Sequence, residues 1–439
     1  MQFTQLDFCT RALPRAVHRR RRLLFSGLAF AITLSTPPTV FAAKADTGPL
    51  SLTEAVRLAD AESPAIAARQ AAVESAEDAI VPAGALPDPQ LVAGIDNLPV
   101  TTGNAFSLTD DFMTMRKIGV MQDVPRREKR HLRTERAQAN AAREQALLTS
   151  ERLSVRESVA RAWIVRAMAE RRLALLQELE PRAQAHVAAA TAAVSAGRGS
   201  VADGIAAKSA KAMLADRISQ VERDVEEARA DFARWLPEAA ERALSDAPDW
   251  ADLGVDPDSL VVNAAHHREL LAYDAAERVA TTEVSLARAE KRPDWSVEFD
   301  YAQRGPRYSN MISLEFRVPL PIFPGGRQDP MIASKQAALV QIQAEREDAR
   351  RMHTAELRKT IAAWRSARER VERYKHELLP LADDRADATL AAYSGGRGDM
   401  QAALTALDAA IEQRIAYTEL QTTLGQAWAT LHFAFPQER

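Results

Sequence analysis

The residue patterns that enzymes use for catalysis are missing from this 439-residue sequence, which contains no H-E-x-x-H or G-x-S-x-G motif. Its single cysteine, Cys9, lies near the N-terminus, ahead of an apolar stretch. No P-loop is present to hold the phosphates of a nucleotide. We therefore predict that the protein is not an enzyme and that it needs no cofactor.

Metal binding by this chain is also poorly supported by its residues. His266 and His267 form the only adjacent histidine pair, and neighbouring side chains on a helix point about 100° apart. Met113, Met115 and Met121 could contact soft cations, but methionine routinely fills gaps between apolar side chains. We predict no metal site.

Charged side chains in strand-like segments are stronger candidates for function. Segments 294–303 and 309–318 alternate apolar and polar residues with the period of a β-strand, and weaker versions of the pattern cover 89–97 and 115–124. If the polar face lines a water-filled path, its charges can select ions by sign; otherwise they only solvate that face. The charged residues of interest are Asp96, Glu298, Asp300, Glu315 and Arg317.

A second candidate is a Gly-Arg-Gly sequence that occurs twice. Glycine permits the left-handed turn that ends a helix, so turn geometry alone accounts for the glycines. The arginines are harder to explain in this way, because the same charge recurs at both turns. We predict that the turns form a gate or dock a partner. The residues are Gly197, Arg198, Gly199, Gly396, Arg397, Gly398 and Asp399.

Long helices must position these residues, because the chain is 46% hydrophobic and has only 17 glycines. Apolar residues from Leu357 to Leu378 recur every 3.5 residues on average, which is typical of helices that pack as coiled coils. We predict a mainly α fold with a small β part. The expected helices cover 52–84, 126–195, 200–235, 259–291, 331–394 and 399–433.

The second half of the chain repeats the first in the same order. IGVMQDVP at 118–125 recurs as ISLEFRVP at 312–319, and Pro87-Asp88 recurs as Pro293-Asp294. We predict that each half forms a helix, two strands, a very long helix, a tight turn and a helix. The division is 46–250, with its turn at 196–200, and 251–439, with its turn at 395–399.

The N-terminus has the pattern of an export signal. Four arginines at 19–22 precede a 12-residue apolar stretch, 23–34, and small residues follow. We predict a signal peptide over residues 1–45, whose removal leaves 50 basic against 59 acidic residues, a formal charge of −9. An acidic exported chain is a poor candidate for binding nucleic acid.

The four predicted strands have the length that crosses an outer membrane, about 9 to 11 residues. Trp295, Tyr301 and Tyr308 lie near strand ends, where interfacial aromatic residues gather. Four strands cannot close a barrel, so a barrel would need several chains. A soluble sheet packed on helices is the alternative that the alternation leaves open.

The duplicated plan resembles the TolC-type outer membrane efflux factors over essentially the whole mature chain. The resemblance rests on LPDP at 86–89, IGVMQDVP, FRVPLPIF at 316–323 and the Gly-Arg-Gly turns. Segment 86–129 is most similar to the heavy-metal branch typified by CzcC and CusC. The resemblance implies a homotrimer with a 12-strand outer-membrane β-barrel, four strands per chain, and a periplasmic tunnel of coiled-coil hairpins.

We therefore predict an outer membrane channel in a tripartite efflux system, with a long periplasmic extension and heavy-metal cations as substrate. The resemblance implies three kinds of partner: outer membrane lipid, a periplasmic adaptor, and an inner-membrane pump of the resistance-nodulation-division type. One alternative is a TolC-type channel for organic compounds or type I secretion. Another is a periplasmic adaptor or structural coiled-coil protein.

Overall fold

The computed structural model describes residues 48–101 and 103–436. The predicted signal peptide, residues 1–45, lies outside the described residues. Within them, no helix combines the length and the apolar character that a membrane span requires.

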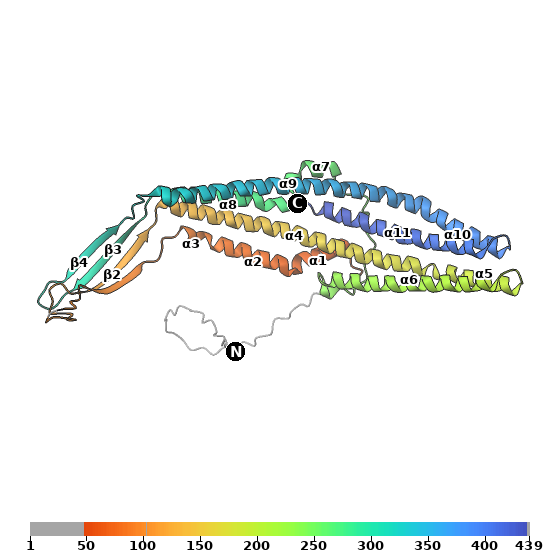
Figure 1. The fold of residues 1–439 in the computed structure, drawn as a ribbon, viewed down its shortest axis with the longest axis horizontal. Coiled ribbons are helices and arrows are strands. Elements are labelled where there is room, and N and C mark those ends of the chain that lie inside the picture. Colours follow the sequence, from red (N-terminus) through yellow and green to blue (C-terminus); the bar gives the residue numbers. More distant parts are fainter. Residues whose placement is uncertain (1–47, 102, 437–439) are drawn as a thin grey trace, which may run out of the picture. The chain divides into compact units, whose positions relative to one another are not determined.

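Two very long helical segments dominate the fold, as the sequence predicts (Figure 1). The first is α4 (Arg127–Gln177) followed by α5 (Glu180–Ser195). The second is α9 (Gln328–Arg373), a π-turn (Tyr374–Leu378) and α10 (Leu379–Ser394). Both segments are interrupted next to a proline, Pro181 or Pro380, because proline lacks the N–H of a regular helix.

The remaining helices lie alongside these two long segments. They are α1 (Leu52–Glu62), α2 (Pro64–Asp78), α3 (Ile80–Gly84), α6 (Val201–Ala233), α7 (Pro257–Val262), α8 (Leu271–Ala289) and α11 (Met400–His432). The prediction of one continuous helix over 52–84 is wrong, because α1, α2 and α3 are separate helices. Ser63 has an extended backbone, with ψ 120°, since the following Pro64 disfavours a helical conformation there.

The helix predicted over 259–291 is also interrupted. Two short 3-10 turns, Ala264–His266 and Arg268–Leu270, separate α7 from α8. His267 stands between the turns with ψ 139°, so the helical hydrogen bonds stop and restart at this point.

One antiparallel sheet carries the four strands in the order β1–β2–β3–β4 (Figure 1). The strands are β1 (Gln90–Asp96), β2 (Met115–Val124), β3 (Trp295–Gln303) and β4 (Met311–Arg317). The register pairs Lys117 with Ala302 and Glu298 with Glu315. Since β2 pairs with β3, the sheet joins residues from both halves of the sequence.

The two faces of the sheet differ in chemistry, as the alternation predicts. The apolar face is exposed, with Leu91 74%, Phe316 65% and Phe299 51% accessible. The polar face holds Glu298 and Asp300, each only 2% accessible. Thus the apolar face does not pack on helices of this chain, as it would in a soluble sheet.

The helices share a core beside the segment that connects the first half of the sequence to the second. The predicted apolar stripe of α9 is buried, with Leu357, Ile361 and Trp364 3–4% accessible. The Trp163 indole of α4 donates to the Leu50 carbonyl at 3.1 Å, and the Trp364 indole of α9 donates to the Trp250 carbonyl at 2.9 Å. Each tryptophan therefore fixes an irregular segment onto a long helix.

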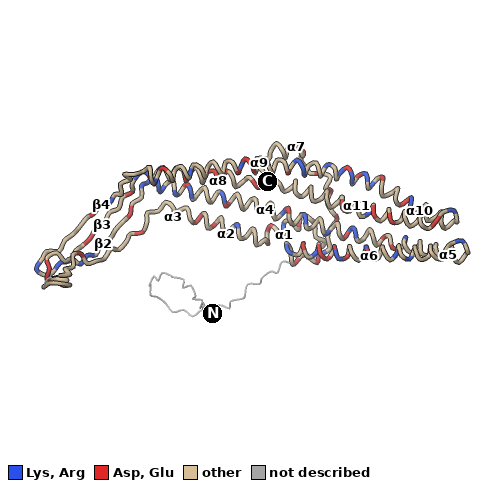
Figure 2. Tube along the Cα trace, viewed as in Figure 1, with Lys and Arg blue, Asp and Glu red and all other residues tan. Residues whose placement is uncertain are grey.

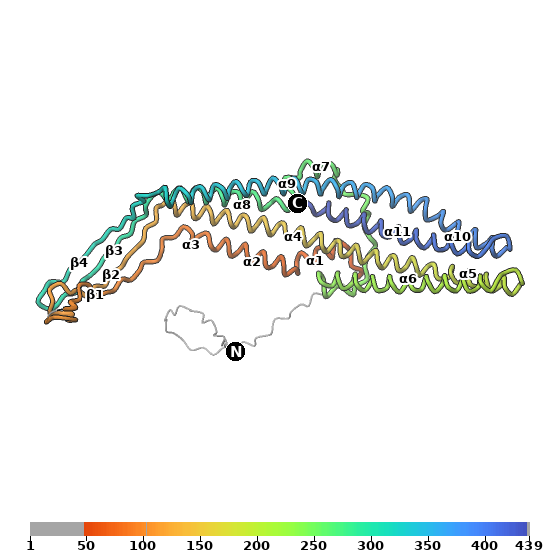
Figure 3. Tube along the Cα trace, viewed as in Figure 1, coloured from red at the N-terminus to blue at the C-terminus, as the bar shows by residue number. Residues whose placement is uncertain are grey.

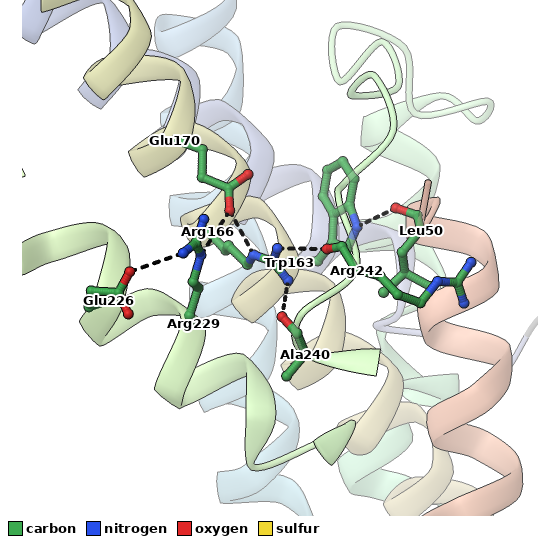
Figure 4. Close-up of polar contacts among 8 residues, drawn as sticks. All are labelled: Leu50, Trp163, Arg166, Glu170, Glu226, Arg229, Ala240 and Arg242. Atoms are coloured by element: carbon green, nitrogen blue, oxygen red, sulfur yellow. Dashed lines mark hydrogen bonds and ion pairs between the residues drawn. The ribbon is translucent and has the colours of Figure 1, made fainter. Parts of the chain in front are cut away.

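A buried arginine anchors the crossing segment that follows α6 (Figure 4). Arg166, 2% accessible, donates to the carbonyls of Ala240 and Arg242, both at 2.7 Å. Its charge is balanced by Glu170 at 2.9 Å, which also pairs with Arg229 at 3.4 Å. The guanidinium thus satisfies two carbonyls that the crossing segment would otherwise leave without a donor.

Candidate functional site

Each of the two long hairpins has a tip turn that joins its two helices, and the hairpins lie side by side (Figure 3). The first tip turn, 196–199, joins α5 to α6, and the second, 395–398, joins α10 to α11. Gly197 has φ +70° and Gly396 has φ +71°, the left-handed conformation that favours glycine. The amide of Arg198 donates to the Ala193 carbonyl at 2.9 Å, and the amide of Arg397 donates to the Ala392 carbonyl at 2.9 Å.

Close packing explains the second glycine of each turn. A Cβ on Gly199 would lie 2.9 Å from the Ala193 Cβ, and a Cβ on Gly398 would lie 3.2 Å from the Ala392 Cβ. The four predicted tip glycines therefore have two structural roles: a left-handed backbone at the first position and close approach at the second.

Each returning helix begins with a side-chain cap. The Ser200 hydroxyl accepts from the Asp203 amide at 3.1 Å, and the Asp203 carboxylate accepts from the Ser200 amide at 2.9 Å. The predicted residue Asp399 caps α11 by accepting from the Ala402 amide at 2.7 Å. Such caps fix the angle at which each helix leaves its turn.

One hydrogen bond connects the two tips. The Tyr393 hydroxyl of α10 donates to Asp203 Oδ2 of α6 at 3.5 Å. Tyr393 is 7% accessible and packs among small apolar side chains that include Ala190, Ala207 and Ala403. Burial raises the pKa of the Tyr393 phenol, and the neighbouring Asp203 charge adds to the rise. We call this contact the tip bond.

The tip bond involves residues that the sequence analysis missed. The spacing of Ser200 and Asp203 is that of a capping box, so the cap itself was detectable. The partner Tyr393 stands 190 residues away, and its only local signal is an aromatic residue in an Ala-rich helix just before the second turn.

The two predicted arginines are exposed but differ in their surroundings. The Arg198 guanidinium reaches the second tip turn, where a Cβ on Gly396 would lie 3.3 Å from Arg198 Nη1. Arg397 stays beside its own turn, where a Cβ on Gly395 would lie 3.8 Å from Arg397 Nε. Arg198 therefore spans both tips.

The predicted charged residues of the strands lie on one face of the sheet. Figure 2 shows charges of both signs on the strands as well as on the helices. Lys117 Nζ lies 3.6 Å from Asp96 Oδ2 and 3.8 Å from Glu298 Oε1. Arg317 pairs with Glu298 and with Glu315, the latter at 3.0 Å. These five residues, Asp96, Lys117, Glu298, Arg317 and Glu315, form what we call the charge ladder; Lys117 was not predicted.

The candidate metal-binding residues do not form a coordination site in the described part of the chain. No three His, Cys, Asp or Glu side chains there are grouped so that they could hold a metal ion. His267 is buried and stacks on His353 at 4.6 Å between ring centroids, whereas His266 is exposed. Desolvation lowers the pKa of His267 to about 4. Met121 Sδ accepts from Arg317 at 3.4 Å.

Residues 55–236 match the family model described as outer membrane efflux protein. No curated protein sequence matches the chain significantly. The match agrees with the predicted outer membrane location and with a channel rather than an enzyme.

Several solved structures share the fold at low sequence identity. A membrane protein from Pseudomonas aeruginosa is 17% identical, with 87% of this chain and 93% of that chain covered and a TM-score of 0.74. CusC, described as forming a transmembrane channel, is 14% identical, with 88% and 92% covered and a TM-score of 0.73. The outer membrane protein VceC from Vibrio cholerae is 16% identical, with 87% and 95% covered and a TM-score of 0.71. The predicted fold class, mainly α with a small β part of four strands, is confirmed.

Proposed function

We propose that this chain, whose residues 55–236 match the outer membrane efflux protein family, is the outer membrane channel of a tripartite efflux system. The observation that carries the proposal is the four-stranded sheet, which exposes an apolar face and carries its paired charges on the opposite face. Within the described residues each edge strand, β1 or β4, has one neighbour. In a bilayer those edges must be paired, and further copies of the same chain provide the strands.

A trimer is the assembly we propose, because three copies of the sheet give the 12 strands of a closed barrel. The apolar faces, with Ile312 68% and Leu314 59% accessible, then contact lipid. The charged faces line the lumen, and the helices α4 to α6 and α9 to α11 build the periplasmic tunnel. We further propose that 46–250 and 251–439 are structural repeats, supported by the matching roles of Trp163 and Trp364.

We propose that the tip turns form the periplasmic gate and the docking point for an adaptor. The tip bond supports gating, because it is a polar contact between the two hairpins of one chain at their far ends. Ion pairs such as Arg182–Asp383, at 2.8 Å, join the same hairpins farther from the tips. The arginines support docking, because Arg198 and Arg397 are exposed there and three chains bring six of them together. Replacing both by alanine should abolish or deregulate efflux while trimers remain; unchanged efflux would refute their role.

We propose heavy-metal cations as the substrate. An acidic excess on the sheet face supports cations over anions: the charge ladder has three carboxylates and two basic groups, and Asp300 adds a fourth carboxylate. The chain has no P-loop, so the driving force must come from its partners, for which we propose a resistance-nodulation-division pump and a periplasmic adaptor.

A deletion strain tests the substrate class. Loss of the gene should increase sensitivity to heavy-metal salts, and a plasmid copy should restore resistance. Increased sensitivity to organic compounds alone, with metal resistance unchanged, would contradict the metal proposal and favour an organic-compound channel.

A further inference from the structure

We infer that Lys117 determines how strongly the barrel lumen prefers cations over anions, an inference that rests on the proposed channel function. Lys117 stands on β2, where it reaches carboxylates on both neighbouring strands. It is therefore placed to neutralise charge that would otherwise face a permeating ion.

The charge ladder crosses all four strands without a break. Lys117 links Asp96 on β1 to Glu298 on β3, and Arg317 links Glu298 to Glu315 on β4. Signs alternate at every step. Glu298 is the only carboxylate of the ladder that both basic groups contact, and it is 2% accessible.

Lys117 is the member of the charge ladder whose loss changes the balance of positive and negative charge on the sheet face most directly. The Lys117 side chain is 22% accessible and that of Asp96 is 45% accessible, so this end of the ladder is open to solvent. Without Lys117, Asp96 loses its ladder partner, while Glu298 still has Arg317. Removal of the ammonium group therefore exposes the Asp96 carboxylate and leaves the buried Glu298 paired with Arg317.

Asp300 adds a carboxylate that the basic residues of the ladder do not pair. It is 2% accessible, and its Oδ1 accepts no hydrogen bond from the described residues. Its position depends on Gly119, because a Cβ there would overlap Asp300 Oδ1. Gly119 and Asp300 are register partners on β2 and β3, so the strand pairing itself makes room for the acid. The surface around Lys117 thus already has more carboxylates than basic groups.

The magnitude follows from Coulomb's law in water. A unit charge acting on an ion at about one Debye length, with ionic screening included, changes the local ion concentration by roughly 1.3- to 1.4-fold, in opposite directions for potassium and chloride, so the ratio of the two ions changes by roughly twofold for each charge. Lys117→Met removes one positive charge from each chain. The permeability ratio of potassium to chloride should therefore rise by roughly two- to threefold or more in the assembled channel.

Purified full-length trimers in planar bilayers under a KCl gradient provide the test. Lys117→Met should shift the reversal potential toward the potassium equilibrium potential. Lys117→Arg, which keeps the charge, should leave it at the wild-type value. The double variant Lys117→Met with Asp96→Asn should return it toward wild type, because one charge of each sign is removed.

The matched control is Lys335→Met. Lys335 pairs with Glu283 at 2.7 Å between α9 and α8, outside the sheet, so its removal changes the net charge equally without changing the ladder. Its reversal potential should equal that of the wild type.

The outcomes separate this inference from the proposed function. Conducting trimers whose reversal potential is the same in Lys117→Met and in wild type would overturn the inference and leave the channel in place. An equal shift in Lys335→Met would overturn it as well, since net charge and not the ladder would then be responsible. Wild-type trimers without any conductance would overturn the channel function, and the inference with it.

Discussion

Removing the tip bond should raise the open probability of the channel. Tyr393→Phe deletes only the hydroxyl that donates to Asp203 Oδ2, and it leaves the Ser200–Asp203 cap of α6 intact. The ring keeps its packing among the tip alanines, because phenylalanine has nearly the same shape. The change is therefore specific to the contact between hairpins.

The size of the effect follows from the geometry of that contact. A hydrogen bond to a charged acceptor contributes about 1.5 to 3 kcal/mol when it is short. The tip bond is 3.5 Å long, at the outer limit, so we assign about 1 kcal/mol to each chain. Three chains that open together lose about 3 kcal/mol, which changes the ratio of open to closed channels by roughly a hundredfold.

Single-channel recording in planar bilayers measures this ratio. Tyr393→Phe trimers should show a higher open probability than wild type, and cells that carry them should become more sensitive to large antibiotics. The matched control is Tyr374→Phe, a change in the π-turn of the second hairpin, away from the tips. An open probability of Tyr393→Phe equal to that of wild type would refute the reasoning.

Three further predictions concern stability and are measured by thermal or denaturant unfolding in detergent. The pKa of His267 is lowered to about 4 in the folded chain, below its unfolded value near 6.5. The contribution of the neutral His267 to the free energy of unfolding is therefore complete above pH 6.5 and is lost as the pH falls toward 4. His267→Gln should remove about 2 kcal/mol of this pH dependence, and an unchanged pH profile would contradict the assignment. Gly197→Ala should cost about 1 kcal/mol because its φ is +70°, whereas Gly204→Ala, inside α6 with nothing within 4 Å, should stabilise slightly; equal effects would refute the turn argument. Arg166→Met should cost about 3 kcal/mol by leaving two carbonyls without a donor, but Arg161→Met, whose side chain is 49% accessible, should cost under about 1 kcal/mol. Similar losses in both variants would show that the buried contacts are not what stabilises the crossing segment.

The helices and strands were predictable because each has a strong local signal. The 3.5-residue stripe of α9 and the two-residue alternation of β3 are set by the faces that the elements bury or expose. The break at Ser63 was missed because a single Ser-Pro step is a weak signal inside an otherwise helical pattern.

The site was only partly predictable, because its key contacts join residues far apart in the sequence. The turns were found from repeated glycines, which act locally. The tip bond joins positions 203 and 393, and Lys117 acquires its role only through the register that sets β2 between β1 and β3. Periodicity places a side chain on a face, but the register decides which charges meet.

Membrane fractionation combined with unheated gel electrophoresis tests the central claim most directly. We predict that the mature protein fractionates with the outer membrane and migrates as a trimer that converts to a monomer on heating, because its four-stranded sheets close a shared barrel. A soluble periplasmic monomer would contradict the channel and return the sheet to the soluble alternative.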